Sequence, residues 1–142
     1  MRLQQLHVDA YPNIYKPFDE SEAISYLSGL LSKTDFSVRV AIHENRPVGH
    51  AVLAVESTSP SMFKHAQRYG HVTQIEVEPD LRGSGIGKRL LQDIDVLAVR
   101  LDLDRVLLDV WAFNDSARAF FLARGYNAFG SKLTRAITPD SV

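Results

Sequence analysis

The sequence predicts one α/β domain over residues 1–142, with a mixed and mostly antiparallel central sheet flanked by helices. Three observations lead to this prediction. The chain of 142 residues is 45% hydrophobic and 23% charged, which suits one globular core. Extended and helical patterns follow one another in the approximate order β-α-β-β-β-α-β-α-β. Internal repeats, low-complexity tracts and linkers are missing from the sequence, so neither a repeat protein nor a helical bundle is expected.

Charge and residue types exclude several classes of protein. The 16 Lys and Arg residues balance 17 Asp and Glu residues, so no basic excess marks a nucleic-acid surface. The chain has no cysteine, and its five histidines never form an H-x-x-x-H pair, so neither disulfides nor a metal site are expected. No apolar stretch approaches the length of a membrane span. We therefore expect a cytoplasmic protein without a membrane or nucleic-acid partner.

The first half of the chain is expected to form a strand, a helix and a hairpin. A short apolar strand is predicted from Leu3 to Val8. Asp19 to Glu22 forms a D-x-x-E capping pattern ahead of apolar residues at helical spacing that continue to Leu31. Apolar and polar residues alternate from Phe36 to Ile42, and a turn at Glu44 to Pro47 leads into a second extended run, Val48 to Val55. This pattern is typical of an antiparallel hairpin.

The second half begins after a polar loop, Ser57 to Gly70, that reads STSPSMFKHAQRYG. A strand is predicted from His71 until Pro79 stops it. A glycine-rich loop then leads into a helix from Ile86 to about Arg100, whose apolar residues recur at helical spacing. Three further elements are predicted: a central strand from Val106 to Trp111, a helix from an Asn114 cap through Leu122, and a last strand from Gly130 to Ile137.

The glycine-rich loop is the segment that indicates a binding function. It reads Arg-Gly-Ser-Gly-Ile-Gly-Lys from Arg82 to Lys88 and lies between a strand end and a helix start, where free amides and the helix dipole favour a phosphate. A nucleotide-binding P-loop is disfavoured, because Arg89 stands where that motif needs Ser or Thr. A dinucleotide fingerprint would need one more residue between the glycines, although Asp109 lies at a suitable distance for its acidic residue.

Arg82, Gly85 and Gly87 fit a third pattern, R-x-x-G-x-G, and here the chain resembles the GNAT superfamily of acyl-CoA-dependent N-acetyltransferases. The segment from Ile75 to Leu91 resembles the fourth strand, pyrophosphate loop and following helix of that family. A second block, from Leu108 through the Gly125-Tyr126 pair, resembles its fifth strand and its N-x-x-A helix start. The two blocks cover about residues 71 to 137.

The resemblance implies a function as well as a fold. It implies acetyl-CoA as cosubstrate, with the pantetheine arm paired to the main chain at Val77, the pyrophosphate in the amides of the loop, and Asn114 both as a helix cap and as a contact of the arm or of a water. Homodimers are common in the family. The residues implied to bind acetyl-CoA are Val77, Arg82, Gly83, Ser84, Gly85, Ile86, Gly87, Lys88, Asn114 and Phe121.

Acetyl transfer to an amine requires a base, because only the neutral amine attacks the thioester. In several members of the family this group lies on the fourth strand, where His71 and Thr73 occupy suitable positions and Glu76 adjoins the cofactor-pairing residue. Histidine titrates near neutral pH, so His71 and Glu76 are the base candidates. The resemblance also implies a tyrosine acid seven residues after the asparagine, but Phe121 stands there, which leaves Tyr126 and Tyr69 as candidate acids.

The function expected is direct transfer of an acetyl group to a primary amine. Two alternatives remain open at this point. Phe121 in place of tyrosine would suit a catalytically weak acyl-CoA-binding module, and the glycine loop alone would also suit a nucleotide or dinucleotide binder. The residues of the polar loop do not identify the acceptor, which is a small molecule or a peptide.

Overall fold

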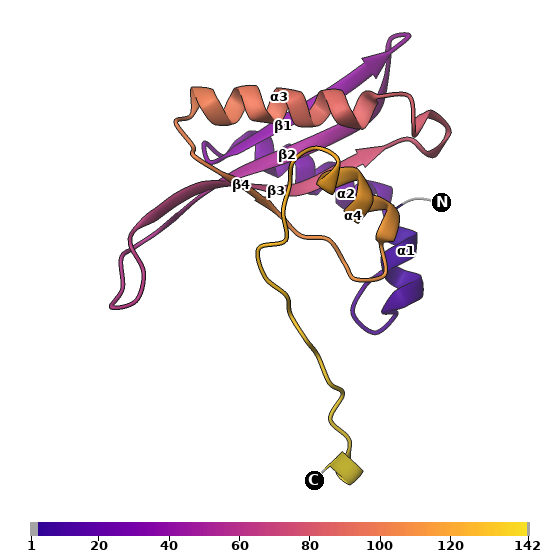
Figure 1. The fold of residues 1–142 in the computed structure, drawn as a ribbon. Coiled ribbons are helices and arrows are strands. Elements are labelled where there is room, and N and C mark those ends of the chain that lie inside the picture. Colours follow the sequence, from indigo (N-terminus) through magenta and orange to yellow (C-terminus); the bar gives the residue numbers. More distant parts are fainter. Residues whose placement is uncertain (1–2, 142) are drawn as a thin grey trace. The chain divides into compact units, whose positions relative to one another are not determined.

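The computed structural model describes residues 3–141, which form two compact units divided after Asp109. The first unit contains the sheet and most of the helices, and the second contains one helix and the C-terminal segment (Figure 1). The elements of the first unit are α1 (Leu3–Ala10), α2 (Glu20–Leu31), β1 (Phe36–His43), β2 (Arg46–Thr58), β3 (Gln67–Val77), the 3-10 turn η1 (Pro79–Leu81), α3 (Ile86–Arg100) and β4 (Val106–Leu108). Those of the second are α4 (Asp115–Leu122) and the 3-10 turn η2 (Pro139–Ser141).

The sheet of the first unit has four strands in the order β1-β2-β3-β4. The first two pairings are antiparallel and the β3–β4 pairing is parallel, so the predicted mixed and mostly antiparallel sheet is confirmed. Glu44 and Asn45 make the turn between β1 and β2 with φ values of 47° and 60°, which is the left-handed backbone that two-residue hairpins prefer. The predicted hairpin is therefore correct.

The core lies between the sheet and α3, which crosses one face of the sheet (Figure 1). Every third or fourth residue of α3 is apolar, so one stripe of the helix is buried. On the sheet, Ala51 and Leu53 of β2 point to this face, because side chains alternate along a strand. The buried cluster consists of Ala51, Leu53, Val72, Leu90, Ile94 and Leu97.

A bulge interrupts β3 in the middle of its pairing with β2. Val52 pairs with Gln74, but the next residue, Leu53, pairs with Val72, so Thr73 is an extra residue on β3. Such a bulge bends the strand and changes which side chains share a face beyond it. Val72 packs in the core before the bulge, and Ile75 packs against the core after it. These residues are three positions apart and would point to opposite faces of a regular strand, so the extra residue brings both to the same face.

The α2 helix begins where the sequence predicts. The Asp19 side chain accepts a hydrogen bond from the amide of Glu22 at 2.8 Å, which is the predicted N-cap. This bond lowers the pKa of the Asp19 carboxyl from its ordinary value. Leu30 is the buried residue of the helix, which packs against β1.

Four predictions of secondary structure are wrong. Two of them mistake the type of element, and two mistake its length. Residues 3–8 belong to helix α1, not to a strand. Leu3, Leu6 and Ala10 recur at helical spacing and only Val8 is β-branched, so local preference favours a helix. Residues 130–137 form no strand, and the described part of the second unit contains no strand with which they could pair. Without a pairing partner, their backbone groups gain nothing from an extended ladder.

The other two errors concern length. The loop predicted from residue 57 to residue 70 is shorter, because β2 and β3 continue as a hairpin as far as the pair Thr58 and Gln67. The strand predicted over residues 106–111 ends at Leu108. Both boundaries depend on where a neighbouring strand is present, which the local pattern does not encode.

Gly49 allows β2 and β3 to approach closely, and its replacement by alanine is expected to destabilise the fold. A Cβ atom at Gly49 would lie 2.8 Å from the backbone carbonyl oxygen of Glu76, and a backbone atom cannot move aside cheaply. We expect Gly49→Ala to lower the free energy of unfolding by about 1–3 kcal/mol. Denaturant unfolding measures this change.

Gly29 provides the matched control. It lies inside α2, and a Cβ atom there would have no neighbour within 4 Å. Gly29→Ala should raise the free energy of unfolding by about 0.8–1 kcal/mol, since alanine is the better helix former. Equal and favourable effects of both substitutions would contradict the close approach at Gly49.

Candidate active site

The glycine-rich loop presents backbone amides at the start of α3. Gly83 and Gly85 have φ values of 80° and 90°, a left-handed backbone that glycine adopts without strain. Gly85 is the N-cap residue, and the first hydrogen bond of the helix runs from the Arg89 amide to the Gly85 carbonyl at 3.1 Å. The amides of residues 86–88 therefore have no acceptor within the helix. With the positive end of the helix dipole, they form a site suited to an anion.

Hydrogen bonds within the loop hold it against the end of β3. The Arg82 Nε donates to the Val77 carbonyl oxygen at 3.2 Å. The Ser84 hydroxyl donates to the carbonyl oxygen of Leu81, and the Leu81 amide donates to Glu78 at 3.0 Å. The loop is thus shaped before any ligand is present, so that a ligand would not have to order it.

The edge of β3 next to this loop is only partly paired in the first unit. On this side β4 pairs with Gly70, His71 and Val72, and residues 73–77 continue beyond β4. The amide of Glu78 donates to the Val48 carbonyl of β2 at 2.8 Å. Because neighbouring strand residues direct their backbone groups to opposite edges, those of Val77 point away from β2, toward the partly paired edge. An extended ligand that carries amides could add to this edge as a strand would.

Glu76 lies beyond the bulge on the face of the sheet opposite α3. Its partner across the strand pair is His50, and paired residues share one face. The His50 Nε2 lies 3.2 Å from the Oε1 of Gln74. Glu76 is half-buried and adjoins Val77, so it lies beside the partly paired edge of β3.

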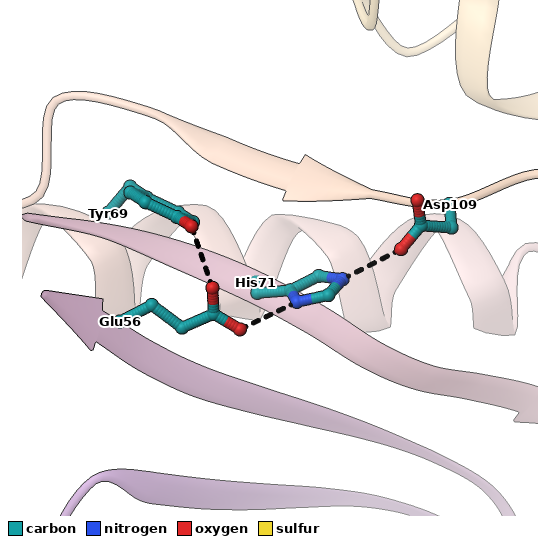
Figure 2. Close-up of polar contacts among 4 residues, drawn as sticks. All are labelled: Glu56, Tyr69, His71 and Asp109. Carbon is teal, nitrogen blue, oxygen red and sulfur yellow. Dashed lines mark hydrogen bonds and ion pairs between the residues drawn. The ribbon is translucent and has the colours of Figure 1, made fainter. Parts of the chain in front are cut away.

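His71 lies upstream of the bulge and is held between two carboxylates (Figure 2). Its Nδ1 is 2.8 Å from the Oε1 of Glu56 on β2, and its Nε2 is 3.1 Å from the Oδ2 of Asp109, just after β4. The Tyr69 hydroxyl donates to the other Glu56 oxygen at 2.7 Å. We call Glu56, Tyr69, His71 and Asp109 the histidine cluster.

The two base candidates do not belong to one constellation. His71 and Glu76 lie five positions apart along β3, and the bulge at Thr73 falls between them. The sequence placed both on the same strand, but only the structure shows that His71 belongs to a polar cluster. Glu56 belongs to no motif in the sequence, and Asp109 fits there only the acidic position of a dinucleotide fingerprint. A charged residue that interrupts the apolar run of β2 was the one available signal for Glu56.

The hydrogen bonds of the cluster shift two pKa values. The bond from Tyr69, followed by that from His71, holds the pKa of the Glu56 carboxyl below its ordinary value of 4.5. The bond to Glu56 raises the pKa of the Tyr69 hydroxyl above its ordinary value, since loss of that proton would break the bond. Glu56 is therefore ionised in the neutral range and fixed by two donors.

This shift predicts a specific loss of stability in acid. Because the folded protein favours the ionised form of Glu56 more than the unfolded chain does, Glu56 stabilises the fold above about pH 4.5, and the contribution disappears as the pH falls below that range. Tyr69→Phe removes the largest cause of the shift, so it should lower stability near neutral pH and flatten the acid decline. Urea unfolding between about pH 7 and about pH 3 measures both effects.

Tyr26→Phe is the control for this prediction. Tyr26 lies on α2 and is half-exposed, so its loss of a hydroxyl should leave the pH dependence unchanged. Parallel pH profiles for Tyr69→Phe and the unchanged protein would show that the bond to Glu56 contributes nothing.

The second unit contains the remaining predicted residues. The Asn114 Oδ1 accepts the amide hydrogen of Ala117 at 3.2 Å, so its capping role at α4 is confirmed. Phe121 is buried, and its ring packs edge-on against the ring of Tyr126 with 5.7 Å between centroids. Position 121 therefore has no hydroxyl group, and the ring in this unit that packs against it and has a hydroxyl is that of Tyr126.

Two further observations concern metals and membranes. Within residues 3–141, no group of three or more His, Asp or Glu side chains is arranged to hold a metal ion. None of the helices described is both long enough and apolar enough to cross a membrane.

The chain belongs to the Acetyltransferase (GNAT) family, which it matches over residues 1–126. The resemblance seen in the sequence is therefore confirmed. No curated protein sequence matches the chain.

Solved structures share this fold at low sequence identity. A mutant of the BH1408 protein from Bacillus halodurans superposes with a TM-score of 0.90 at 20% identity, over 96% of this chain and 87% of that one. The aminoglycoside 6'-N-acetyltransferase AAC(6')-IG from Acinetobacter haemolyticus has a TM-score of 0.71 at 15% identity, over 91% and 88% of the two chains. The aminoglycoside acetyltransferase meta-AAC0020 from an uncultured soil metagenomic sample has a TM-score of 0.67 at 21% identity, over 96% and 85%.

Proposed function

We propose that the protein is an acetyl-CoA-dependent N-acetyltransferase that acetylates a primary amine. One observation carries the proposal: the partly paired edge of β3 at Val77 runs directly into the glycine-rich loop at the start of α3. An extended arm with amides and a pyrophosphate at one end is the ligand that matches both features. Acetyl-CoA has this structure, and it supplies the activated acetyl group.

Backbone groups of this chain would hold the cosubstrate. The main chain of Val77 would pair with the pantetheine arm, since it points to the edge away from β2. The amides from Gly83 to Lys88 would surround the pyrophosphate, and Arg82 would keep the loop in position through its bond to Val77. Lys88 stands in the first turn of α3, where a cation opposes the helix dipole. A bound pyrophosphate would compensate for that unfavourable position.

His71 and Glu76 are the residues that would accept the proton of the acceptor ammonium. His71 is the stronger candidate because its ring is fixed by Glu56, whereas no hydrogen bond orients the carboxylate of Glu76 among the described residues. A base that is itself oriented by a third group is a common arrangement for proton transfer. Tyr126 is the candidate acid for the departing thiolate, since Phe121 occupies the family's tyrosine position.

A catalytically weak acyl-CoA-binding protein is the second candidate function. The buried phenyl ring of Phe121 supports it, because this position cannot protonate the leaving thiolate. A thiolate has a reference pKa of about 8.5 and leaves without full protonation, so the replacement slows transfer without abolishing it. The enzyme remains the function that the histidine cluster supports better.

A thermal-shift series with acetyl-CoA, coenzyme A, NAD and ATP tests the cosubstrate. A ligand at about 100 times its Kd adds roughly 2.7 kcal/mol of stability, which is several degrees for a domain of this size. We expect selective stabilisation by acetyl-CoA and coenzyme A. Stabilisation by NAD or ATP alone would overturn the proposal.

Thiol release with a panel of amines then tests the reaction. Aminoglycosides belong in the panel because two structural neighbours are aminoglycoside acetyltransferases. Turnover of any amine supports the enzyme. Tight binding of acetyl-CoA with no turnover across the panel would favour the acyl-CoA-binding protein.

A further inference from the structure

The hairpin of β2 and β3 extends past the other two strands of the sheet. β1 pairs with β2 only as far as Ala54, and β4 pairs with β3 only from Gly70 onward. Beyond these positions the two strands continue together to the pair Thr58 and Gln67, and a turn then joins them (Figure 1). We call residues 57–68 the hairpin end.

Contacts at its base hold the hairpin end in place. A two-stranded hairpin is marginally stable by itself, but the Arg105 guanidinium donates to the Gln67 side chain at 2.6 Å and lies over the Tyr69 ring at 4.9 Å from its centroid. The Arg68 guanidinium donates to the carbonyl oxygen of Leu101, just after α3. The hairpin end is therefore anchored to the loop that joins α3 to β4.

The tip of the hairpin is a formed turn that presents two large apolar side chains. The Ser61 hydroxyl oxygen accepts the amide hydrogens of Phe63 and Lys64 at 3.2 and 3.1 Å, and the Ser61 amide donates to the Lys64 carbonyl oxygen at 2.8 Å. Met62 and Phe63 in this turn are 86% and 85% exposed. Because neither side chain is buried in the fold, packing gives no reason for a methionine and a phenylalanine here.

The charged residues of the hairpin end are all basic. Residues 57–68 contain Lys64 and Arg68, together with His65, but no Asp or Glu, in a chain whose net charge is −1. The acidic residues of the loop after α3 adjoin Leu101, which contacts the base of the hairpin end. Exposed apolar side chains with basic residues beside them are typical of a segment that enters an anionic lipid surface to a shallow depth.

The size of the tip favours a lipid surface over a protein partner. A stable protein interface uses about 800 Å² of each partner, whereas the large apolar side chains exposed within residues 57–68 are Met62 and Phe63. A bilayer needs no complementary shape, because apolar side chains enter the acyl boundary while basic ones stay with the headgroups. The absence of an apolar span, from which no membrane partner was expected, does not bear on a surface contact of this kind.

We propose that the hairpin tip binds the surface of a membrane that contains anionic lipids, with Met62 and Phe63 in the acyl boundary and Lys64 among the headgroups. The proposal is independent of acetyl transfer. β3 runs from Gln67 at the hairpin end to Val77 beside the glycine-rich loop, so the tip and the proposed acetyl-CoA site lie at opposite ends of one strand. A protein bound through its tip keeps that site accessible.

Co-sedimentation of the full chain with lipid vesicles tests the proposal. The probes are vesicles of phosphatidylcholine alone and vesicles of equal parts phosphatidylcholine and phosphatidylglycerol. We expect binding to the anionic vesicles, about tenfold weaker binding to the neutral ones, and weaker binding to the anionic vesicles as salt is raised. Absence of binding to the anionic vesicles, or equal binding to both kinds, would overturn the proposal.

Two variants test the apolar and the basic part of the tip separately. The double substitution Met62→Ser with Phe63→Ser should weaken binding to the anionic vesicles about tenfold or more, because the apolar area that enters the lipid is lost. Lys64→Gln should weaken it about fivefold, the usual effect of one cation near an anionic surface. Urea unfolding should show unchanged stability, since all three side chains are exposed.

Substitutions outside the hairpin are the matched controls. Leu133 and Ile137 are 97% and 70% exposed, and Leu133→Ser with Ile137→Ser should bind the anionic vesicles as the unchanged protein does. The same is expected of Lys132→Gln, at an exposed position of that segment. Losses in the controls equal to those in the hairpin variants, or full binding by the hairpin variants, would refute a contact through the tip.

Sedimentation velocity without lipid and thermal shifts with acetyl-CoA test two other roles of the tip. If the unchanged protein self-associates, binds no vesicles, and becomes monomeric in Met62→Ser with Phe63→Ser, the tip contacts a second copy of the chain and the proposal fails. The double variant should keep the stabilisation by acetyl-CoA. Loss of that stabilisation would assign the tip to the acetyl-CoA site and contradict a role at the membrane.

Discussion

Replacement of His71 by alanine is expected to lower kcat for amine acetylation by about 10²- to 10⁴-fold, the usual contribution of a positioned general base. The affinity for acetyl-CoA should stay the same, because the ring contacts Glu56 and Asp109 and not the glycine-rich loop. Steady-state kinetics with an amine found in the thiol-release panel measures kcat. Calorimetric titration with acetyl-CoA measures the affinity.

Two comparison variants make this result specific. Glu76→Gln tests the other base candidate, and its kcat should fall much less than that of His71→Ala. His65→Ala removes an exposed histidine in the loop between β2 and β3 and should have no effect. A larger loss in Glu76→Gln, together with an unchanged pH–rate profile in His71→Ala, would transfer the role of base to Glu76.

The second large effect is expected at Gly85, where alanine should weaken acetyl-CoA binding by about tenfold or more. The φ of 90° at this N-cap costs an L-residue about 1–2 kcal/mol, so the loop would relax toward another backbone and move its amides away from the pyrophosphate. Calorimetry gives the Kd. The fold should survive, because a Cβ atom at Gly85 would have no neighbour within 4 Å.

Gly125→Ala controls for backbone strain in this experiment. Gly125 also has a φ of 90° and open space around its Cβ position, but it follows α4 instead of preceding α3. Both variants should lose similar stability, while only Gly85→Ala should lose affinity for acetyl-CoA. Equal losses of affinity would show that the effect comes from general destabilisation.

Local sequence pattern correctly predicted the elements whose caps, turns and apolar stripes are formed by neighbouring residues. The capping pattern at Asp19 and the apolar stripe of α3 predicted both helices, because a capping bond and a helical stripe depend on residues within a few positions of one another. The turn at Glu44 and Asn45 was predicted for the same reason. The cap at Asn114 is a further local signal that the structure confirms.

Local pattern failed where the outcome depends on a distant partner. Residues 3–8 and 130–137 each contain apolar residues that suit more than one element. In the first segment helical spacing prevails. In the second, an extended ladder would need a neighbouring strand, and the described part of the second unit has none. The sequence alone does not show which segments pair in the folded chain, so local pattern could not decide which type of element these two segments form.

The candidate active site also has a part that local sequence pattern predicts and a part that depends on distant residues. By itself, the sequence determined the family and the glycine-rich loop, because the loop's chemistry depends on contiguous glycines at a helix start. Only the tertiary structure decided that Glu56, His71 and Asp109 meet, since they come from three strands or strand ends and lie 15 and 38 residues apart along the chain. Their meeting depends on the pairing of β2 with β3 and of β3 with β4. A shift of either register by one residue would turn these side chains to the other face of the sheet.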